Sequence, residues 1–137
     1  MHTYHWLLPH PEAVSHAYVR RVAAAELSVD AAALRFDWSG KPVCRSHPAW
    51  HFSLSHSGPH LVIATHDSPI GIDIEVIRPF DTRVIRRLSP AEQAAHARGT
   101  SFFELWTKRE AAFKSASPTP HFTPITISPD TCCYLCT

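Results

Sequence analysis

The sequence has little net charge and no long apolar run, and each shortage excludes a class of protein. The formal net charge is +1 over 137 residues, so nothing attracts the chain generally to nucleic acid or membrane, and recognition of phosphate has to be local. No apolar stretch approaches the ~20 residues that span a bilayer, and the first residues lack the basic start and apolar core of a signal peptide. We therefore expect a cytoplasmic protein without nucleic-acid or membrane partners.

The sequence also contains few lysines, and its cysteines are not spaced for a set of disulfides. Only Lys41, Lys108 and Lys114 supply ammonium groups, so each can be considered individually as a ligand-binding group. Three of the four cysteines lie in the last six residues, which is a poor layout for a disulfide framework and indicates reduced thiols. The apolar content of 45% over 137 residues indicates one globular domain, or two small halves that share a core.

The hydrophobic periodicity and the turn residues predict an α+β fold. Helices are expected over 12–27, 90–97 and 101–115. The first should bury one face made by Val14, Ala17, Tyr18, Val22 and Ala25. Strands are expected over 4–8, 51–55, 61–65, 70–77, 122–128 and 132–135, with the turn at 67–69 folding strand 70–77 back antiparallel to its predecessor.

The stretch Gly71-Ile72-Asp73-Ile74-Glu75 is the most informative part of the sequence. Alternation along a strand places both carboxylates on one face and the isoleucines on the other. Neighbouring carboxylates repel each other, and a hard cation such as Mg²⁺ relieves that repulsion through oxygen ligands. A solvated strand face explains the same pattern, so the rest of the chain has to decide between the two interpretations.

The helix expected over 101–115 carries Trp106, Glu110 and Lys114 at intervals of four residues, which places them along one stripe. An exposed ion pair worth ~0.3–0.5 kcal/mol is one explanation. The alternative is that the stripe borders a packed face, where an acid serves as a metal ligand or general base. The packed face is expected to contain Phe102, Leu105, Trp106, Ala112 and Phe113. Trp106 is expected to serve packing.

The segment from His51 to Gly58 puts hydroxyl groups and an imidazole at a strand end beside a glycine turn. Backbone amides can approach an anion at such a place. Ser55 and His56 are therefore candidate anion contacts, with a capped turn and a surface histidine as the alternative. Glu92 is left out of any site because the capping box Ser89-Pro-Ala-Glu92 explains it.

Four ordered segments, Gly40-Lys41-Pro42, Phe52-Ser-Leu-Ser-His-Ser57, Gly71-Ile-Asp-Ile-Glu75 and Trp106-Thr-Lys-Arg-Glu-Ala-Ala-Phe-Lys114, resemble the 4′-phosphopantetheinyl transferase family. The likeness is to its broad-specificity branch, which activates peptide and polyketide synthases, and it covers residues 14 to 128 approximately. It implies a fold of two small pseudo-symmetric halves, about 1–66 and 67–137, each with a mainly antiparallel sheet packed on a helix.

The resemblance also implies an activity. The family transfers 4′-phosphopantetheine from coenzyme A to a serine of an acyl or peptidyl carrier protein, with Mg²⁺ as cofactor and adenosine 3′,5′-bisphosphate as product. By motif, Asp73, Glu75 and Glu110 correspond to the metal ligands and Glu110 to the base toward the carrier serine. Lys114 corresponds to a pyrophosphate contact, and Lys41 and His56, with Ser55 adjacent, to contacts with the phosphates of the coenzyme.

The chain also departs from the family pattern. It is much shorter than members of this branch, and the basic helical segment that holds the 3′-phosphate of the coenzyme is missing. Arg20, Arg45 and His10 are candidate replacements. We expect a monomer with two reduced halves, with a homodimer as the alternative, and residues 132–136 as the closing strand.

Two other functions are compatible with these residues. One is a non-catalytic relative that binds a carrier protein or coenzyme A. The other is a zinc-binding module built on Cys132, Cys133 and Cys136, because thiolates are zinc ligands. Adjacent cysteines in a strand point to opposite faces, which argues against the zinc site.

Overall fold

The computed structural model describes residues 1–137 and confirms an α+β fold with small antiparallel sheets. The helices are α1 (Pro11–Leu27), α2 (Pro90–Ala97) and α3 (Phe102–Ser115), with short 3₁₀ helices at Ala31–Ala33 and Thr82–Arg87. The strands are β1 (His2–Leu7), β2 (Phe36–Asp37), β3 (Val43–Cys44), β4 (His51–Ser57), β5 (His60–His66), β6 (Gly71–Val76), β7 (Phe122–Pro124) and β8 (Thr131–Cys136). No helix is long and apolar enough to cross a membrane.

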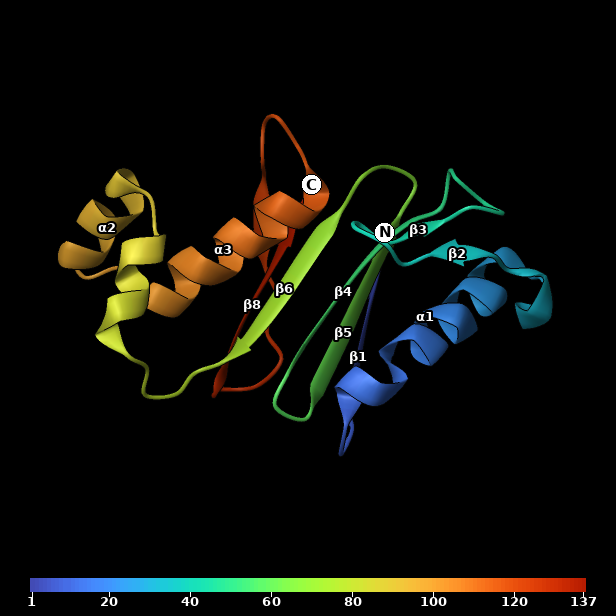
Figure 1. Ribbon diagram of the computed structural model, residues 1–137, viewed down its shortest axis with the longest axis horizontal. Coiled ribbons are helices and arrows are strands. Elements are labelled where there is room, and N and C mark those ends of the chain that lie inside the picture. Colours follow the sequence, from blue (N-terminus) through green and yellow to red (C-terminus); the bar gives the residue numbers. More distant parts are fainter.

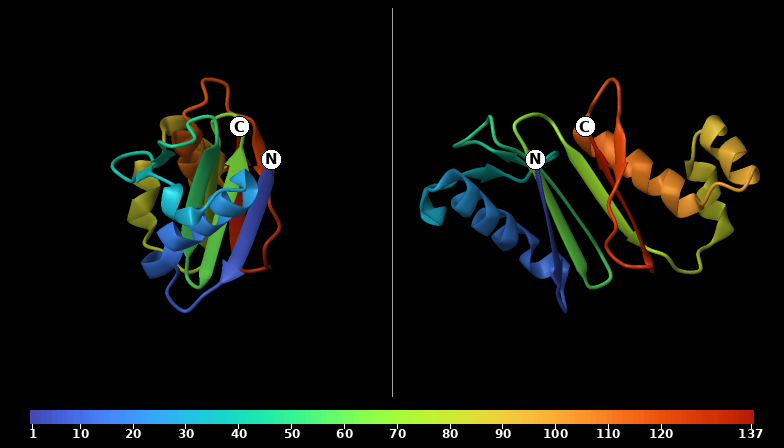
Figure 2. Two further views of the ribbon diagram at one scale, coloured as in Figure 1. Left: turned by 90° about the vertical axis from the view of Figure 1, so that its right-hand side faces the viewer. Right: turned by 180° about the vertical axis from the view of Figure 1, so that it is seen from behind.

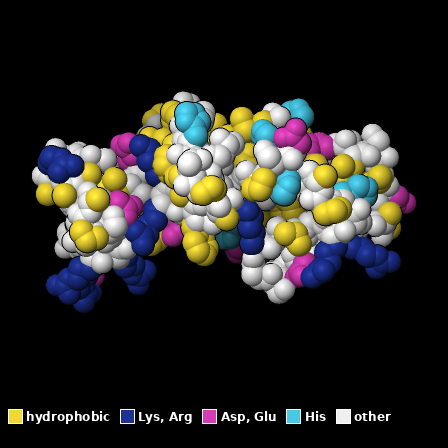
Figure 3. All heavy atoms as spheres, turned by 90° about the horizontal axis from the view of Figure 1, so that it is seen from above, with side chains coloured by type: hydrophobic (Ala, Val, Ile, Leu, Met, Phe, Trp, Pro, Cys, Tyr) yellow, Lys and Arg dark blue, Asp and Glu magenta, His cyan; other side chains and the backbone are white.

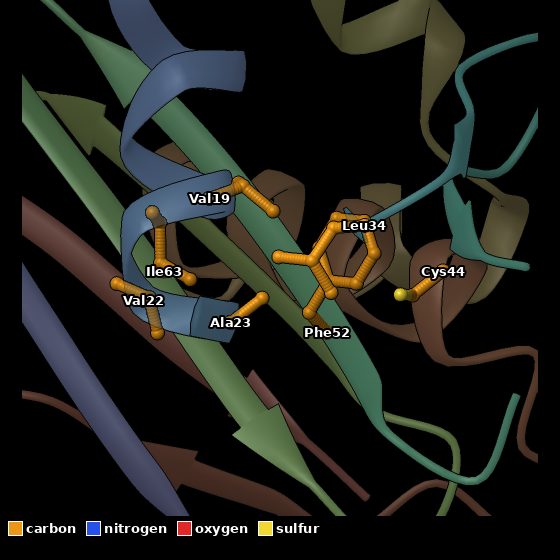
Figure 4. Packing of buried hydrophobic residues seen from close by; sticks show 7 residues of the cluster. All are labelled: Val19, Val22, Ala23, Leu34, Cys44, Phe52 and Ile63. Carbon is orange, nitrogen blue, oxygen red and sulfur yellow. The ribbon is translucent and has the colours of Figure 1, made fainter. Parts of the chain in front are cut away.

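The first sheet has the order β1-β5-β4 and packs on α1. Its strands are antiparallel, and β4 and β5 form the hairpin that the sequence predicts, with Ser57 opposite His60 at the turn. Val19, Val22 and Ala23 of α1 face Phe52 and Ile63 of the sheet (Figure 4). The predicted buried face of α1 was wrong in part, since Val14, Ala17 and Ala25 are exposed. Val22 is buried as predicted, and Ser15, Val19 and Ala23 form the rest of the inward face.

The second sheet has the order β6-β8-β7 and packs on α3. The predicted closing strand is confirmed, because β8 pairs antiparallel with both β6 and β7. Ile72 and Ile74 point away from α3 into a core between the two sheets, where they meet Val62 and Ala64 of β5. The strand expected over 122–128 ends at Pro124.

The layers follow one another as α1, first sheet, second sheet and α3 (Figures 1 and 2). The predicted pairing of strand 70–77 with the preceding strand was wrong: β6 pairs with β8 and borders β4 of the other sheet. Serine side chains of β4 make this contact, because the hydroxyl oxygens of Ser53, Ser55 and Ser57 accept hydrogen bonds from backbone N–H groups of β6. We call this contact between β4 and β6 the seam.

Helix α3 lies directly against the backbone of β6. A Cβ atom added to Gly71 would stand 2.0 Å from the carbonyl oxygen of Ala111, so only glycine permits this approach. The buried residues of the helix are Phe102, Phe103, Thr107, Ala111 and Ser115. The predicted face was therefore wrong at Phe113, which is 82% exposed, because close packing on a strand selects small side chains.

The helix starts test two predicted caps. At α2 both hydrogen bonds of the Ser89–Glu92 capping box are present, as the sequence predicts. At α3 the sequence Ser101-Phe-Phe-Glu104 repeats the same pattern and predicts a cap, but this prediction was wrong, since Ser101 makes no side-chain cap. Glu104 instead accepts a hydrogen bond from Lys108 one turn later.

Candidate active site at the seam

Asp73 is a buried carboxylate on the α3 side of β6, with only 5% of the residue exposed. Its Oδ1 atom accepts hydrogen bonds from Lys114 Nζ at 2.7 Å and from Ser55 Oγ at 2.9 Å. The three residues come from three elements, β6, α3 and β4. The seam therefore brings Asp73, Lys114 and Ser55 together, which the sequence predicts as members of one site.

The other oxygen of Asp73, Oδ2, is buried and has no hydrogen-bond partner. Burial raises the pKa of the Asp73 carboxyl, and the Lys114 ammonium and the Ser55 hydroxyl oppose that rise. A buried polar atom left without a partner costs about 1–3 kcal/mol. Such an atom is expected where a ligand completes the coordination.

Glu75 lies two residues further along the same face of β6. Its Oε2 atom accepts a hydrogen bond from Ser57 Oγ at 3.4 Å. Burial and the neighbouring Asp73 carboxylate raise the pKa of Glu75. The residue also lines a cavity of about 170 Å³ with an aromatic wall and two arginines, formed by Arg78, Phe80, Val84, Arg87, Phe102, Phe103 and Trp106. Trp106 stacks on Phe102 there, in keeping with the expected packing role.

Lys114 reaches across the seam and has three acceptors. Besides Asp73 Oδ1, its Nζ atom donates to the carbonyl oxygens of Ile72 at 3.0 Å and Leu54 at 3.3 Å. An ammonium group has three N–H donors, so all of them are used within the protein. Lys114 thus holds α3 to both sheets, a role that the helical spacing did not reveal.

Lys41 lies near Lys114, as expected for two residues that serve one ligand. Both line a cavity of about 240 Å³ with Pro42, Phe52, Ser53 and Leu54. Lys41 also lines a neighbouring cavity of about 440 Å³, together with Arg45, whose guanidinium pairs with Asp37. Partial burial lowers the pKa of Lys41. Of the three cationic groups beside the seam, Lys41 is therefore the one that has no carboxylate partner.

Two expected site residues lie apart from this group. His56 is exposed and is not among the residues that line the cavity shared by Lys41 and Lys114. Glu110 is half-buried on α3, in the turn before Lys114, and its carboxylate makes no hydrogen bond or ion pair. Its roles as metal ligand and base stay predictions.

Other residues considered for phosphate binding have structural partners. The Arg20 guanidinium donates to the carbonyl oxygens of Ala31 and Leu34, both at 2.8 Å. His10 lies on the surface, 3.7 Å from Glu12. Arg45 lies beside Lys41, and its guanidinium pairs with Asp37. Other basic side chains gather at the end of the molecule that carries α2 (Figure 3), and Arg83, Arg86, Arg87 and Arg98 belong to this end.

The residues fit a divalent cation in part. Asp73 Oδ2 and the Glu75 carboxylate are neighbouring oxygen donors of the kind that Mg²⁺ prefers, and the missing partner of Oδ2 is what an ion would supply. However, no three His, Cys, Asp or Glu side chains are grouped closely enough to form a metal site. Asp73, Glu75 and Glu110 are thus not assembled as one cluster.

The C-terminal cysteines do not form a zinc site either. Cys133 is buried beside Ile74 in the core between the sheets. Cys136 accepts a hydrogen bond from Ser115 Oγ of α3 at 3.2 Å. The two thiols thus lie on opposite faces of β8, as alternation along a strand requires.

Sequence reasoning missed the part that Ser53 and Ser57 play in the seam. The signal was available, since serine recurs at every second position of β4 and so occupies one face. What the sequence could not show is that this face borders the backbone of β6 rather than solvent.

The fold and the site together define a small α+β protein with an acidic centre between two sheets. Residues 69–130 match the sequence model of the 4′-phosphopantetheinyl transferase superfamily. The chain is 43% identical over 83 residues to 4′-phosphopantetheinyl transferase psf-1 of Bacillus pumilus, covering 56% of this chain and 36% of the relative. It is 34% identical over 122 residues to a 4′-phosphopantetheinyl transferase of Bacillus subtilis, covering 82% and 54%.

A third relative, 4′-phosphopantetheinyl transferase Sfp of Bacillus subtilis strain 168, is 28% identical over 120 residues, which cover 81% of this chain and 54% of Sfp. The chain belongs to the 4′-phosphopantetheinyl transferase superfamily. It spans only about half the length of these relatives, or less.

Proposed function

We propose that the protein transfers the 4′-phosphopantetheine group of coenzyme A to a serine of an acyl or peptidyl carrier protein, converting the apo carrier to the holo form. The observation that carries the proposal is the pair Asp73 and Glu75, with Asp73 Oδ2 buried and unpartnered, inside the region that matches the superfamily. Lys114 compensates the pair only in part, because the pKa of both carboxyls stays raised, so a bound cation would offset the remaining repulsion.

The residues that would hold Mg²⁺ are Asp73 and Glu75, with Glu110 of α3 as the proposed third ligand. When bound, the ion supplies positive charge to the phosphoryl oxygens and the leaving group. Lys41, at the mouth of two cavities, binds phosphate groups of the coenzyme. Lys114 adds positive charge at the same place while it keeps Asp73 oriented.

Glu110 is proposed as the base toward the carrier serine. It has no ion-pair partner within the protein, so its carboxylate is free to accept a proton at an Oε atom, directly or through water. The attacking hydroxyl loses this proton as the serine oxygen bonds to the β-phosphorus of coenzyme A. The bond from this phosphorus to the bridging oxygen breaks, and adenosine 3′,5′-bisphosphate leaves with that oxygen.

The arrangement proposed for the whole chain is one transferase domain with two pseudo-symmetric halves, about 1–66 and 67–137. Each half contains one three-stranded sheet and the helix that packs on it. A monomer is proposed, with a homodimer as the alternative, and sedimentation of the purified protein distinguishes the two.

The proposal is tested by incubating the protein with coenzyme A, Mg²⁺ and a panel of apo carrier proteins. Mass spectrometry should show a carrier heavier by one phosphopantetheine group, and a carrier whose acceptor serine is replaced by alanine should stay unmodified. Glu110→Ala should abolish transfer and keep the circular dichroism spectrum of the wild type. Glu104→Ala is the matched control, because Glu104 lies on the same helix in a surface pair with Lys108. No modification of any carrier would contradict the proposal.

A second candidate function is a non-catalytic relative that binds a carrier protein or coenzyme A. The observation that favours it is Lys114, whose three N–H donors all have acceptors within the protein. Tight binding of coenzyme A or a carrier, measured by calorimetry without any turnover, would identify this function.

A further inference from the structure

The seam contains a repeated interaction that joins the two sheets without a backbone ladder. Ser53, Ser55 and Ser57 share one face of β4. Their hydroxyl oxygens accept hydrogen bonds from the N–H groups of Ile72 at 3.0 Å, Ile74 at 3.3 Å and Val76 at 3.0 Å. Each serine thus meets a successive N–H group along the edge of β6. The register between the two sheets is fixed by three side chains.

Ser55 and Ser57 each make a second hydrogen bond, and Ser53 does not. The hydroxyl of Ser55 donates to Asp73 Oδ1 at 2.9 Å, and that of Ser57 donates to Glu75 Oε2 at 3.4 Å. A hydroxyl has one donor and two acceptor sites, so both bonds can coexist on one oxygen. Ser53 binds the backbone of β6 but contacts no carboxylate.

We propose that Ser55 and Ser57 are positioning residues for the acidic centre. This inference rests on the proposed function and goes beyond it. Each serine hydroxyl is held by a backbone N–H group of β6 and in turn directs the carboxylate beside that group. The first sheet thereby orients ligands that the second sheet carries, and the lone pairs of Asp73 Oδ2 stay available to a divalent ion.

Burial makes this orientation effective. Ser55 and Asp73 are 9% and 5% exposed, so water cannot replace the lost hydroxyl without opening the seam. Without the Ser55 hydroxyl, Asp73 Oδ1 keeps only the hydrogen bond from Lys114. The carboxylate can then rotate about its side-chain torsions. Loss of a group that orients a metal ligand typically weakens ion affinity about 10-fold or more.

The test compares Ser55→Ala with Ser53→Ala, which is a closely matched control. The two serines have similar burial, 9% and 6%, and each binds one N–H group of β6, but only Ser55 contacts a carboxylate. Both variants should lower the melting temperature, Ser55→Ala by more, because it also removes the hydrogen bond to the Asp73 carboxylate. Affinity for Mn²⁺ in the absence of coenzyme A, whose proposed cavity Ser53 lines, is measured by electron paramagnetic resonance. It should fall about 10-fold in Ser55→Ala and stay near the wild-type value in Ser53→Ala. Ser55→Thr, which keeps a hydroxyl, should have an affinity near the wild-type value. This variant replaces Ser55→Ala in the comparison if the alanine variant does not fold.

A second measurement needs neither ion nor turnover. The side-chain carboxyl ¹³C resonance of Asp73, recorded without divalent ions, should shift in Ser55→Ala and not in Ser53→Ala. An unchanged resonance, or equal Mn²⁺ affinities in the two variants, overturns the positioning role even if the wild type modifies carriers. Conversely, a wild type that modifies no carrier but shows the selective shift would support the positioning role while the transferase function fails.

Discussion

Lys114 Nζ lies 2.7 Å from Asp73 Oδ1 and ties helix α3 to the central strand of the site. Breaking such a pair from one side leaves a buried carboxylate uncompensated. Lys114→Met should therefore lower the free energy of unfolding by about 2–4 kcal/mol in urea titrations.

Lys108→Met is the control for this measurement, because Lys108 pairs with the half-exposed Glu104 of the same helix and lies over the ring of Tyr134. Solvent-accessible contacts of this kind contribute about 1 kcal/mol or less. Adding Asp73→Asn to Lys114→Met should recover part of the lost stability, since the unpaired charge is removed. Equal losses for the two lysine variants would contradict the structural role of Lys114.

Gly71 should tolerate no side chain. A Cβ atom there would meet the carbonyl oxygen of Ala111 at 2.0 Å and the backbone nitrogen of Ser115 at 2.7 Å. Both obstacles are backbone atoms of α3, so the helix as a whole would have to move. Gly71→Ala should cost about 2–3 kcal/mol of stability and reduce the hydrogen-exchange protection of α3 more than that of α1. Uniform loss of protection in both helices would show that the contact is not local.

Glu75→Gln should stabilise the protein at neutral pH. Burial and Asp73 raise the pKa of Glu75 above its ordinary value of 4.5, so wild-type stability falls as the pH rises from below 4.5 through the raised pKa. The variant should gain stability of the order of 1 kcal/mol at pH 7, and the gain should vanish in acid where Glu75 is protonated in both states. Thermal melts from pH 3 to 8 measure this difference. A variant less stable than wild type at pH 7 would count against a strained carboxylate pair.

Glu26 should show the opposite pH dependence. Burial opposes its ionisation, but hydrogen bonds from Tyr4, Trp50 and Thr65 outweigh burial and lower the pKa of Glu26. Its contribution to stability is therefore present above the ordinary pKa of 4.5 and is lost as the pH falls through the lowered value.

Glu26→Gln should cost about 1–3 kcal/mol at pH 7, with a smaller loss at acid pH. Trp50 Nε1 donates to Glu26 Oε2 at 2.6 Å, so the fluorescence of Trp50 reports the change directly. A loss that does not vary with pH would exclude the carboxylate charge as its cause.

Local sequence patterns predicted where the helices and strands lie better than they predicted which strands pair and which faces pack. Alternation identified β6 and the capping box identified α2, because both signals reside in a few neighbouring residues. The neighbour of β6 was missed because the seam depends on serine side chains of β4. Serines at alternate positions of a strand are equally typical of a face that contacts solvent. The face of α3 was missed because close approach to Gly71 selects Thr107, Ala111 and Ser115 over larger apolar residues.

The site was anticipated to a similar degree. Asp73, Ser55 and Lys114 meet in one hydrogen-bonded group, although the three acceptors of Lys114 could not be read from helical spacing. Glu110 was placed by motif alone, and no contact in the structure joins it to the carboxylate pair. Distances between elements decide such questions, and a single sequence does not contain them.

Transfer of phosphopantetheine is proposed to require the two carboxylates on β6. Its most direct test is the mass of an apo carrier protein after incubation with coenzyme A, Mg²⁺ and either wild-type protein or Glu75→Gln. With the wild type the carrier should become heavier by one phosphopantetheine group, and with Glu75→Gln it should stay unchanged although that variant is folded. Equal modification by both proteins would contradict it.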